Sequence, residues 1–372
     1  MRVLHVITGL CAGGAEHQLR LLLRRLPYDC EVATLTGPGP VAATIRADGT
    51  TVHELPMSSN HDVSVVARLR RLIRDGGFDL VHTHLYRACV HGRVAARLAG
   101  VPVVATEHSL GDGFIEGRRT SAGVRWLYRA TERMGRTTIA VSGTVAHRLR
   151  AWGVPADRIA VIPNGIDAAE FAYDPVLRAR TRDRLGIARD TVVIGGVGRL
   201  EPAKRFDHLI WALGEVPDTV LLLVGEGSAG AALREQALRS GLGDRVIFTG
   251  AVGHTRDMLC AMDVFASPSV QETFGLAVLE ALACGLPALY AVCPPLDGVP
   301  DSGAQRLSRD PESLPRALRA EVVRLAERDG ARLPVPPVAT RYDIARLADA
   351  VSRLYERIVC AGQPVESKGS PR

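Results

Sequence analysis

The chain has 372 residues, of which 47% are hydrophobic and 23% are charged, and its net charge is +6. This length exceeds what one hydrophobic core usually supports, so we expect two domains. Seven cysteines without a C-x-x-C pair argue against a disulfide framework or a structural zinc site. No apolar run reaches the length of a membrane span, and the N-terminus lacks a signal-peptide pattern, so we expect a cytoplasmic protein.

The basic residues are almost all arginine: of 46 basic residues only Lys204 and Lys368 are lysine. Aromatic residues make up 5% and are not interleaved with basic clusters, so no nucleic-acid partner is expected. The densest basic segment is a helical pattern that carries four arginines, Arg68, Arg70, Arg71 and Arg74. A solvated helix face explains it; the alternative is contact with an anionic membrane, which would place the protein peripherally on the inner membrane face.

Short apolar runs alternate with helical patterns along the first half of the chain, which predicts a parallel sheet covered by helices. The predicted strands are 3–7, 31–35, 52–55, 80–83, 101–106, 138–141 and a run beginning at Ile159, and the predicted helices include 15–26, 63–73 and 90–98. His82 and His84 end one predicted strand and His108 follows the next. Because ligands of such sheets bind beyond the carboxyl ends of the strands, these side chains are placed for a binding site. For His82 and His84 a purely structural role is equally compatible.

The second half repeats the alternation, with predicted strands at 192–197, 220–224, 246–249, 264–267 and 288–292. We place the hinge near Asn164 and expect an N-terminal domain over 1–165 and a C-terminal domain over 166–340, with a polar connector at 168–190. A terminal helix is predicted at 341–360, and residues 361–372 are expected to be disordered.

The most informative stretch runs from Ser267 to Pro287 and places Glu272 in a loop and Glu280 in the helix that follows. A helix that begins near Phe274 to Ala277 offers unpaired N–H groups and a positive dipole to an anion. A carboxylate on either side of this anion site suits a ligand with phosphate in its middle and hydroxyls at both ends. The stretch therefore indicates a sugar nucleotide.

This stretch resembles the Glu-x7-Glu motif of retaining GT-B glycosyltransferases, above all those of glycosyltransferase family 4. Other strings of the family appear in order: Gly-Gly-x-Glu from Gly13, Ile-Pro-Asn-Gly-Ile-Asp from Ile162, and Gly-Arg-Leu-x-x-x-Lys from Gly198 to Lys204. The resemblance implies a GT-B fold of class α/β, with two Rossmann-like domains facing across a cleft. It implies acceptor binding by the N-terminal domain and nucleotide-sugar binding by the C-terminal one.

The resemblance also assigns roles. The residues implied in catalysis are Glu272 (donor sugar), Arg199 and Lys204 (diphosphate), and His108 (donor sugar and phosphate). The residues implied in donor binding are Gly13, Gly14, Gly198, Arg199, Lys204, Gly225, Gly227, Glu272, Thr273, Phe274, Gly275, Leu276 and, on the ribose, Glu280. Downstream of Pro287 the chain departs from the family pattern, which leaves the donor assignment open.

The implied reaction is transfer of a hexosyl group, such as GlcNAc or Glc, from a UDP-linked donor to an acceptor hydroxyl with retention at the anomeric carbon. Nothing in the sequence identifies a general base. The acceptor stays open between a lipid, an oligosaccharide and a small metabolite, since its determinants lie in variable loops such as 110–123, where Arg118 and Arg119 are candidates for an anionic acceptor.

No metal site and no cofactor are expected, because the chain contains no Asp-x-Asp pair and two cations can neutralise a departing diphosphate. Three alternatives stay open: a sugar-nucleotide 2-epimerase of the same fold, a non-catalytic nucleotide-sugar sensor, and an NAD oxidoreductase. The last rests on the stretch Gly225–Gly230, which matches G-x-G-x-x-G after a predicted strand.

Overall fold

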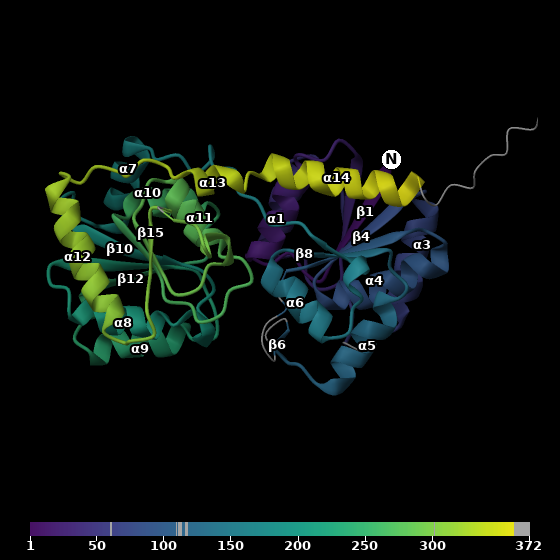
Figure 1. The fold of residues 1–372 in the computed structure, drawn as a ribbon, viewed down its shortest axis with the longest axis horizontal. Coiled ribbons are helices and arrows are strands. Elements are labelled where there is room, and N and C mark those ends of the chain that lie inside the picture. Colours follow the sequence, from purple (N-terminus) through teal and green to yellow (C-terminus); the bar gives the residue numbers. More distant parts are fainter. Residues whose placement is uncertain (60–61, 109, 111–113, 116–117, 301, 361–372) are drawn as a thin grey trace, which may run out of the picture. The chain divides into compact units, whose positions relative to one another are not determined.

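In the computed structural model the chain divides into two compact units (Figure 1), Met1–Asn164 with Ile344–Arg372, and Gly165–Asp343. We call them unit 1 and unit 2. The structure describes residues 1–59, 62–108, 110, 114–115, 118–300 and 302–360. The tail predicted at 361–372, and residues 111–113 and 116–117 of the loop predicted at 110–123, therefore lie outside the described residues. No helix within the described part is both long and apolar enough to cross a membrane.

Unit 1 is built on a parallel sheet of seven strands in the order β3-β2-β1-β4-β5-β8-β9. The bounds are β1 (Arg2–Ile7), β2 (Asp29–Thr34), β3 (Val52–Glu54), β4 (Leu80–His84), β5 (Val103–Glu107), β8 (Thr137–Ala140) and β9 (Ile159–Val161). The order reverses between β1 and β4, as in doubly wound Rossmann sheets. A short antiparallel hairpin, β6 (Phe114–Ile115) and β7 (Arg118–Arg119), lies where the sequence predicted an irregular loop.

The helices of unit 1 cover both faces of this sheet (Figure 1). They are α1 (Gly14–Leu23), α2 (Gly39–Ala47), α3 (Ser64–Asp75), α4 (Tyr86–Ala99), α5 (Ala122–Glu132), α6 (Gly143–Ala151) and the terminal α14 (Ile344–Cys360), with a 3-10 turn at Ala156–Arg158. Because strand side chains alternate between faces, Leu4 and Val81 pack on the core of α3 and α4, whereas Val3 and Leu80 pack on α14. The last helix of the chain thus completes the core around the first strand.

Unit 2 is built on a second parallel sheet, of six strands in the order β12-β11-β10-β13-β14-β15. The strands are β10 (Val192–Val197), β11 (Thr219–Val224), β12 (Val246–Gly250), β13 (Val264–Ser267), β14 (Ala288–Tyr290) and β15 (Ala304–Arg306). Its helices are α7 (Pro175–Leu185), α8 (Phe206–Gly214), α9 (Gly230–Arg239), α10 (Thr255–Ala261), α11 (Leu276–Ala283), α12 (Ser313–Glu327) and α13 (Pro337–Arg341), with 3-10 turns at Pro202–Lys204, Gly243–Arg245 and Pro294–Leu296. The prediction of two Rossmann-like α/β domains is confirmed.

One expectation about unit 2 is wrong. The segment predicted to be a polar connector, 168–190, contains the helix α7, and its Arg182 is buried against Asp263. Arg182 Nη2 lies 2.6 Å from Asp263 Oδ2, and Arg178 Nη2 lies 2.7 Å from Asp263 Oδ1. The high arginine content of the segment concealed the helix, because two arginines of α7, Arg178 and Arg182, pair with Asp263 whereas the other charged residues of the helix are exposed.

Candidate functional site

The reversal of strand order in unit 2 falls between β10 and β13, which pair with each other. In open α/β sheets, ligands bind beyond the carboxyl ends of the strands at such a reversal. The loop after β10 carries Gly198, Arg199 and Lys204, and the loop after β13 carries Glu272 and leads into α11. The sheet topology therefore brings the two most distinctive segments of the sequence to the same point.

The two loops are joined by one backbone hydrogen bond and one side-chain hydrogen bond to the same carbonyl. The N–H of Val270 donates to the carbonyl of Ala203 over 3.1 Å, and the hydroxyl of Ser269 donates to the same carbonyl over 3.3 Å. Lys204 Nζ then lies 2.5 Å from Glu272 Oε1, and 23% and 14% of these two side chains are exposed. The cation and the carboxylate proposed for diphosphate and donor sugar are thus direct neighbours.

Gly198, Gly225 and Gly227 line the same end of the sheet. Gly225 adopts a φ of 134°, and a Cβ added to it would lie 2.0 Å from the carbonyl oxygen of Gly198. Only glycine allows this approach of two backbones. The neighbouring N–H of Leu200 donates to the carbonyl of Glu226 over 2.8 Å, so the turns after β10 and β11 form one surface.

The helix α11 begins at Leu276, and Gly275 caps it with a φ of 98°. A Cβ at Gly275 would lie 2.8 Å from Cys293 Sγ, so this turn also requires glycine. Phe274 anchors the turn in the core, where its ring meets Tyr342 edge-on with centroids 5.3 Å apart. Within the described residues, no backbone carbonyl accepts from the N–H groups of Leu276 or Ala277. These donors are available to an anion.

Glu280 lies in α11, four residues after its first residue, and is half-buried. Burial, with the neighbouring carboxylate of Glu170 as the second cause, raises the pKa of Glu280 to about 7. An ionised carboxylate in this position is held at a cost in folding free energy. Such a group is retained more readily for binding than for stability.

Replacing Glu280 by Gln is expected to separate these two effects. The folded-state pKa exceeds the unfolded one, so ionisation of Glu280 weakens folding as the pH rises from 4.5 through 7. Glu280→Gln should therefore raise the Tm by about 2–4 °C at pH 8 and leave it unchanged at pH 5. Thermal unfolding at both pH values measures this. Glu170→Gln is the matched control. It removes the neighbouring carboxylate, so it should lower the pKa of Glu280 and reduce the Tm difference that Glu280→Gln makes at pH 8. If wild type and Glu280→Gln have equal Tm values at pH 8, ionisation of Glu280 does not weaken folding and its pKa is not raised.

Lys204 forms an ion pair with Glu272, whereas Arg199 is exposed and forms no ion pair with any residue that the structure describes. Its charge lies near Glu201, whose pKa is lowered chiefly by a hydrogen bond from Ser228. The Ser228 hydroxyl donates to Glu201 Oε2 over 2.6 Å.

Thr273 lies in the loop between Glu272 and α11 and is half-buried. The structure thus brings Lys204 and Glu272 into contact, but not Arg199 or Glu280 with either of them.

The remaining predicted site residues belong to unit 1. Gly13 and Gly14 form the turn from β1 into α1, and Gly13 has an extended backbone whose carbonyl accepts from the N–H of His17 over 3.1 Å. His108 directly follows β5, which is the strand next to β4 in the sheet. Both positions lie at the carboxyl ends of strands around the β1/β4 reversal, the equivalent of the site in unit 2.

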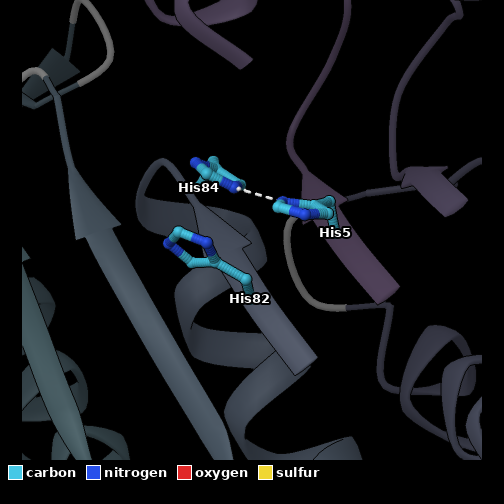
Figure 2. A group of neighbouring side chains, drawn as sticks. All are labelled: His5, His82 and His84. Carbon is cyan, nitrogen blue, oxygen red and sulfur yellow. Dashed lines mark hydrogen bonds between the residues drawn. The ribbon is translucent and has the colours of Figure 1, made fainter. Parts of the chain in front are cut away.

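His108 ends a chain of buried imidazoles. His84 Nδ1 lies 3.2 Å from His108 Nε2, and His84 Nε2 lies 3.1 Å from His5 Nδ1. His82 contacts Tyr355 Oη over 2.5 Å and Thr106 Oγ1 over 2.7 Å. Figure 2 shows how the rings of His5, His82 and His84 gather between β1 and β4. Burial lowers the pKa of His5 to about 3 and that of His108 to about 4, and it lowers those of His82 and His84 well below their usual range.

The ring nitrogens of His5, His82 and His84 lie within 4.8 Å of one another, a spacing compatible with metal ligation. Both nitrogens of His82 and the facing nitrogens of His5 and His84 are already engaged in hydrogen bonds. The cluster therefore fits a hydrogen-bonded network of neutral rings better than a cation site. His5 and Tyr355 belong to no motif of the sequence; it is the pairing of β1 with β4 that makes His5 and His82 register partners.

Comparison with known proteins agrees with the fold. Residues 12–170 match the family model described as Glycosyltransferase Family 4, and residues 191–328 match that described as Glycosyl transferases group 1. The chain belongs to the GT4-type glycosyltransferases. This assignment confirms the family expected from the sequence, whereas its retaining mechanism stays a prediction.

The relatives include enzymes with different substrates. A D-inositol 3-phosphate glycosyltransferase of Acidothermus cellulolyticus is 33% identical over 64% of this chain and 57% of its own length. The UDP-Gal:alpha-D-GlcNAc-diphosphoundecaprenol alpha-1,3-galactosyltransferase of Escherichia coli is 32% identical over 62% of each chain. The match thus spans less than two thirds of either relative.

Among solved structures, Anabaena HepE in complex with UDP and glucose superposes with a TM-score of 0.83 at 22% identity, over 96% of this chain and 100% of that one. This similarity, together with the two parallel sheets, confirms the GT-B fold for this GT4-type chain.

Proposed function

We propose that this GT4-type chain is a retaining, metal-independent hexosyltransferase with a UDP-linked sugar as donor. The observation that carries the proposal is the contact between Lys204 and Glu272 at the strand-order reversal of unit 2, beside the open N-terminus of α11. A nucleoside diphosphate sugar needs a cation, an array of N–H donors and carboxylates for its hydroxyls, and this end of the sheet offers all three.

Each site residue then has a role. Lys204, Arg199 and the N–H groups of α11 neutralise the diphosphate as the glycosidic bond breaks, which is stabilisation of developing charge rather than proton transfer. Glu272 accepts hydrogen bonds from hydroxyls of the donor sugar and Glu280 from those of the ribose. The Gly225 and Gly227 turn lies beside the nucleobase. The roles that the family resemblance implies for Gly13, Gly14 and His108, which lie in unit 1, stay predictions.

The bond changes follow from these roles. The diphosphate departs with the electron pair of the anomeric C–O bond, and the acceptor hydroxyl attacks from the same face, passing its proton to the departing phosphate oxygen. No side chain is assigned as a general base, and no metal is required because the cationic side chains and the helix end neutralise the leaving group.

The choice of UDP rests on similar proteins. HepE is known in complex with UDP-glucose, and the E. coli relative is named for a UDP-Gal donor and a lipid diphosphate acceptor. Glucose, GlcNAc and galactose are therefore the first donor sugars to test. The acceptor stays open between a lipid-linked sugar, an oligosaccharide and a small metabolite.

Calorimetric titration with UDP, GDP, ADP and dTDP sugars, each with EDTA and with Mg²⁺, tests the donor assignment. We expect UDP sugars to bind equally well under both conditions, and Glu280→Ala to weaken binding by about 10- to 100-fold through the loss of a charged hydrogen-bond partner. Binding that requires Mg²⁺ would refute metal independence. If no sugar nucleotide binds, the proposed function fails.

Turnover distinguishes the remaining alternatives. NMR of the anomeric signal of the product should show the configuration of the donor. Release of an epimerised nucleotide sugar without acceptor would indicate a 2-epimerase, and tight donor binding without any turnover across an acceptor panel would indicate a sensor.

A further inference from the structure

The helix α5 of unit 1 is firmly anchored on one side. Its N-cap Ser121 accepts from the N–H of Val124 over 3.2 Å, and Tyr128 is fully buried, with its ring edge-on to Trp152 at 5.5 Å between centroids. Glu132 is buried as well, with Arg158 Nε 2.9 Å from its Oε1. The helix is therefore a rigid element that presents its other side outward.

The outward side carries apolar residues that nothing in the described structure covers. Trp126 is 70% exposed, Leu127 is 39% exposed, and Met134, just beyond the helix, is 40% exposed. A tryptophan exposed to this extent, with two further exposed apolar side chains in the same segment, is unusual for a surface that contacts only water.

Three arginines flank these residues. Arg125, Arg129 and Arg133 follow each other at intervals of four, so they lie on one side of the helix, and all three are exposed. None of them forms an ion pair with a described Asp or Glu, and the one acidic residue of α5, Glu132, is buried and engaged. We call Arg125, Trp126, Leu127, Arg129, Arg133 and Met134 the α5 surface.

The basic helix singled out in the sequence differs from α5. In α3 the apolar residues Leu69 and Ile73 are buried, and Arg68 and Arg70 donate to the carbonyls of Pro56 and Leu98. The apolar side of α3 thus faces the core, and its arginines are explained by a solvated helix face. Cationic and exposed apolar side chains occur together on α5 instead.

We propose that the α5 surface docks onto an anionic phospholipid bilayer. Trp126, Leu127 and Met134 would enter the interface between headgroups and acyl chains, where tryptophan is favoured, and the arginines would contact the headgroup phosphates. The combination favours a membrane over an acidic protein or nucleic acid, because purely charged partners would leave the apolar half of the surface uncovered. The docking is independent of the proposed catalytic site in unit 2.

Co-sedimentation with vesicles tests the proposal. We expect binding to phosphatidylcholine vesicles that contain about 30 mol % phosphatidylglycerol, loss of binding to phosphatidylcholine alone, and weakening with salt. Arg125→Glu with Arg129→Glu should lower partitioning at least about tenfold, and so should Trp126→Ser, through loss of the apolar contact. The matched control, Arg70→Glu with Arg74→Glu on α3, makes the same charge change in the same unit and should bind like the wild type.

A spectroscopic readout distinguishes docking from general attraction. In a Trp211→Phe background, tryptophan emission should shift to the blue on vesicle binding, and Trp126→Ser should abolish the shift; circular dichroism checks that each variant is folded. If the α3 and α5 variants lose binding equally, net charge alone explains it and the proposal fails. Binding to heparin but not to vesicles would assign the surface to a polyanion and also overturn it.

Discussion

Replacing Lys204 by Ala is expected to lower kcat/KM for the nucleotide-sugar donor by about 100- to 1000-fold. The ammonium group would be lost from the point where the diphosphate gains charge. Glu272, now 2.5 Å from Lys204 Nζ, would be left as a largely buried carboxylate beside that charge. Loss of the ammonium group and the unpaired carboxylate both weaken binding of the diphosphate in the transition state. Initial rates at saturating acceptor, with donor varied, measure the effect.

Two further variants decide how the loss arises. Arg239→Ala removes a cation of unit 2 whose one ion pair among the described residues is with the exposed Glu235, and it should leave the kinetics unchanged. If repulsion from the stranded Glu272 causes much of the loss, the double variant Lys204→Ala with Glu272→Gln should be less impaired than the sum of its single variants. A decrease of less than about fivefold for Lys204→Ala would exclude it from the diphosphate site.

Acidification is expected to unfold unit 1 well before carboxylate titration would do so. His5, His82, His84 and His108 have pKa values lowered by burial, so between pH 6.5 and about 4 the unfolded chain binds protons that the folded chain does not. Stability therefore falls as the pH falls through this window. Each such histidine lowers the free energy of unfolding by about 1.4 kcal/mol at pH 5.5, or by about 6 kcal/mol for the four together.

Urea unfolding at several pH values, followed by Trp126 and Trp152 in a Trp211→Phe background, reports on unit 1. The slope of the unfolding free energy against pH should correspond to uptake of three to four protons near pH 5. His84→Asn should reduce this number, whereas His147→Gln, at an exposed position, should not. A slope of less than one proton would show that the imidazoles are already charged in the folded state.

The architecture was predictable because each strand is a short apolar run and the runs alternate with helical patterns. β15 was missed, since Ala304–Arg306 lacks an apolar run and is a strand only because it pairs with β14. The helix α7 was missed for a different reason: its buried residues are the polar Thr181 and Arg182, so no apolar stripe marks it, and Arg182 is buried only because it pairs with Asp263. Both failures are cases in which tertiary contacts override local composition.

The part of the candidate site that lies in one continuous motif could be predicted from the sequence. Spacing alone could place Glu272 and Glu280 in one stretch, but the contact between Lys204 and Glu272 depends on β10 and β13 being neighbours. The histidine network was out of reach for the same reason. It joins residues from three strands and from α14, and its hydrogen bond between His82 and Tyr355 spans 273 positions of the sequence.

The hydrogen bond between His82 and Tyr355 has a consequence for the order in which the chain acquires structure. Unit 2 is a continuous segment, Gly165–Asp343, and can complete its core as soon as that segment leaves the ribosome. Unit 1 must wait, because the helix that covers His5 and His82 is synthesised only after unit 2 has been made. Until then the face of the first strands that α14 covers stays exposed, which makes the incomplete chain prone to aggregation.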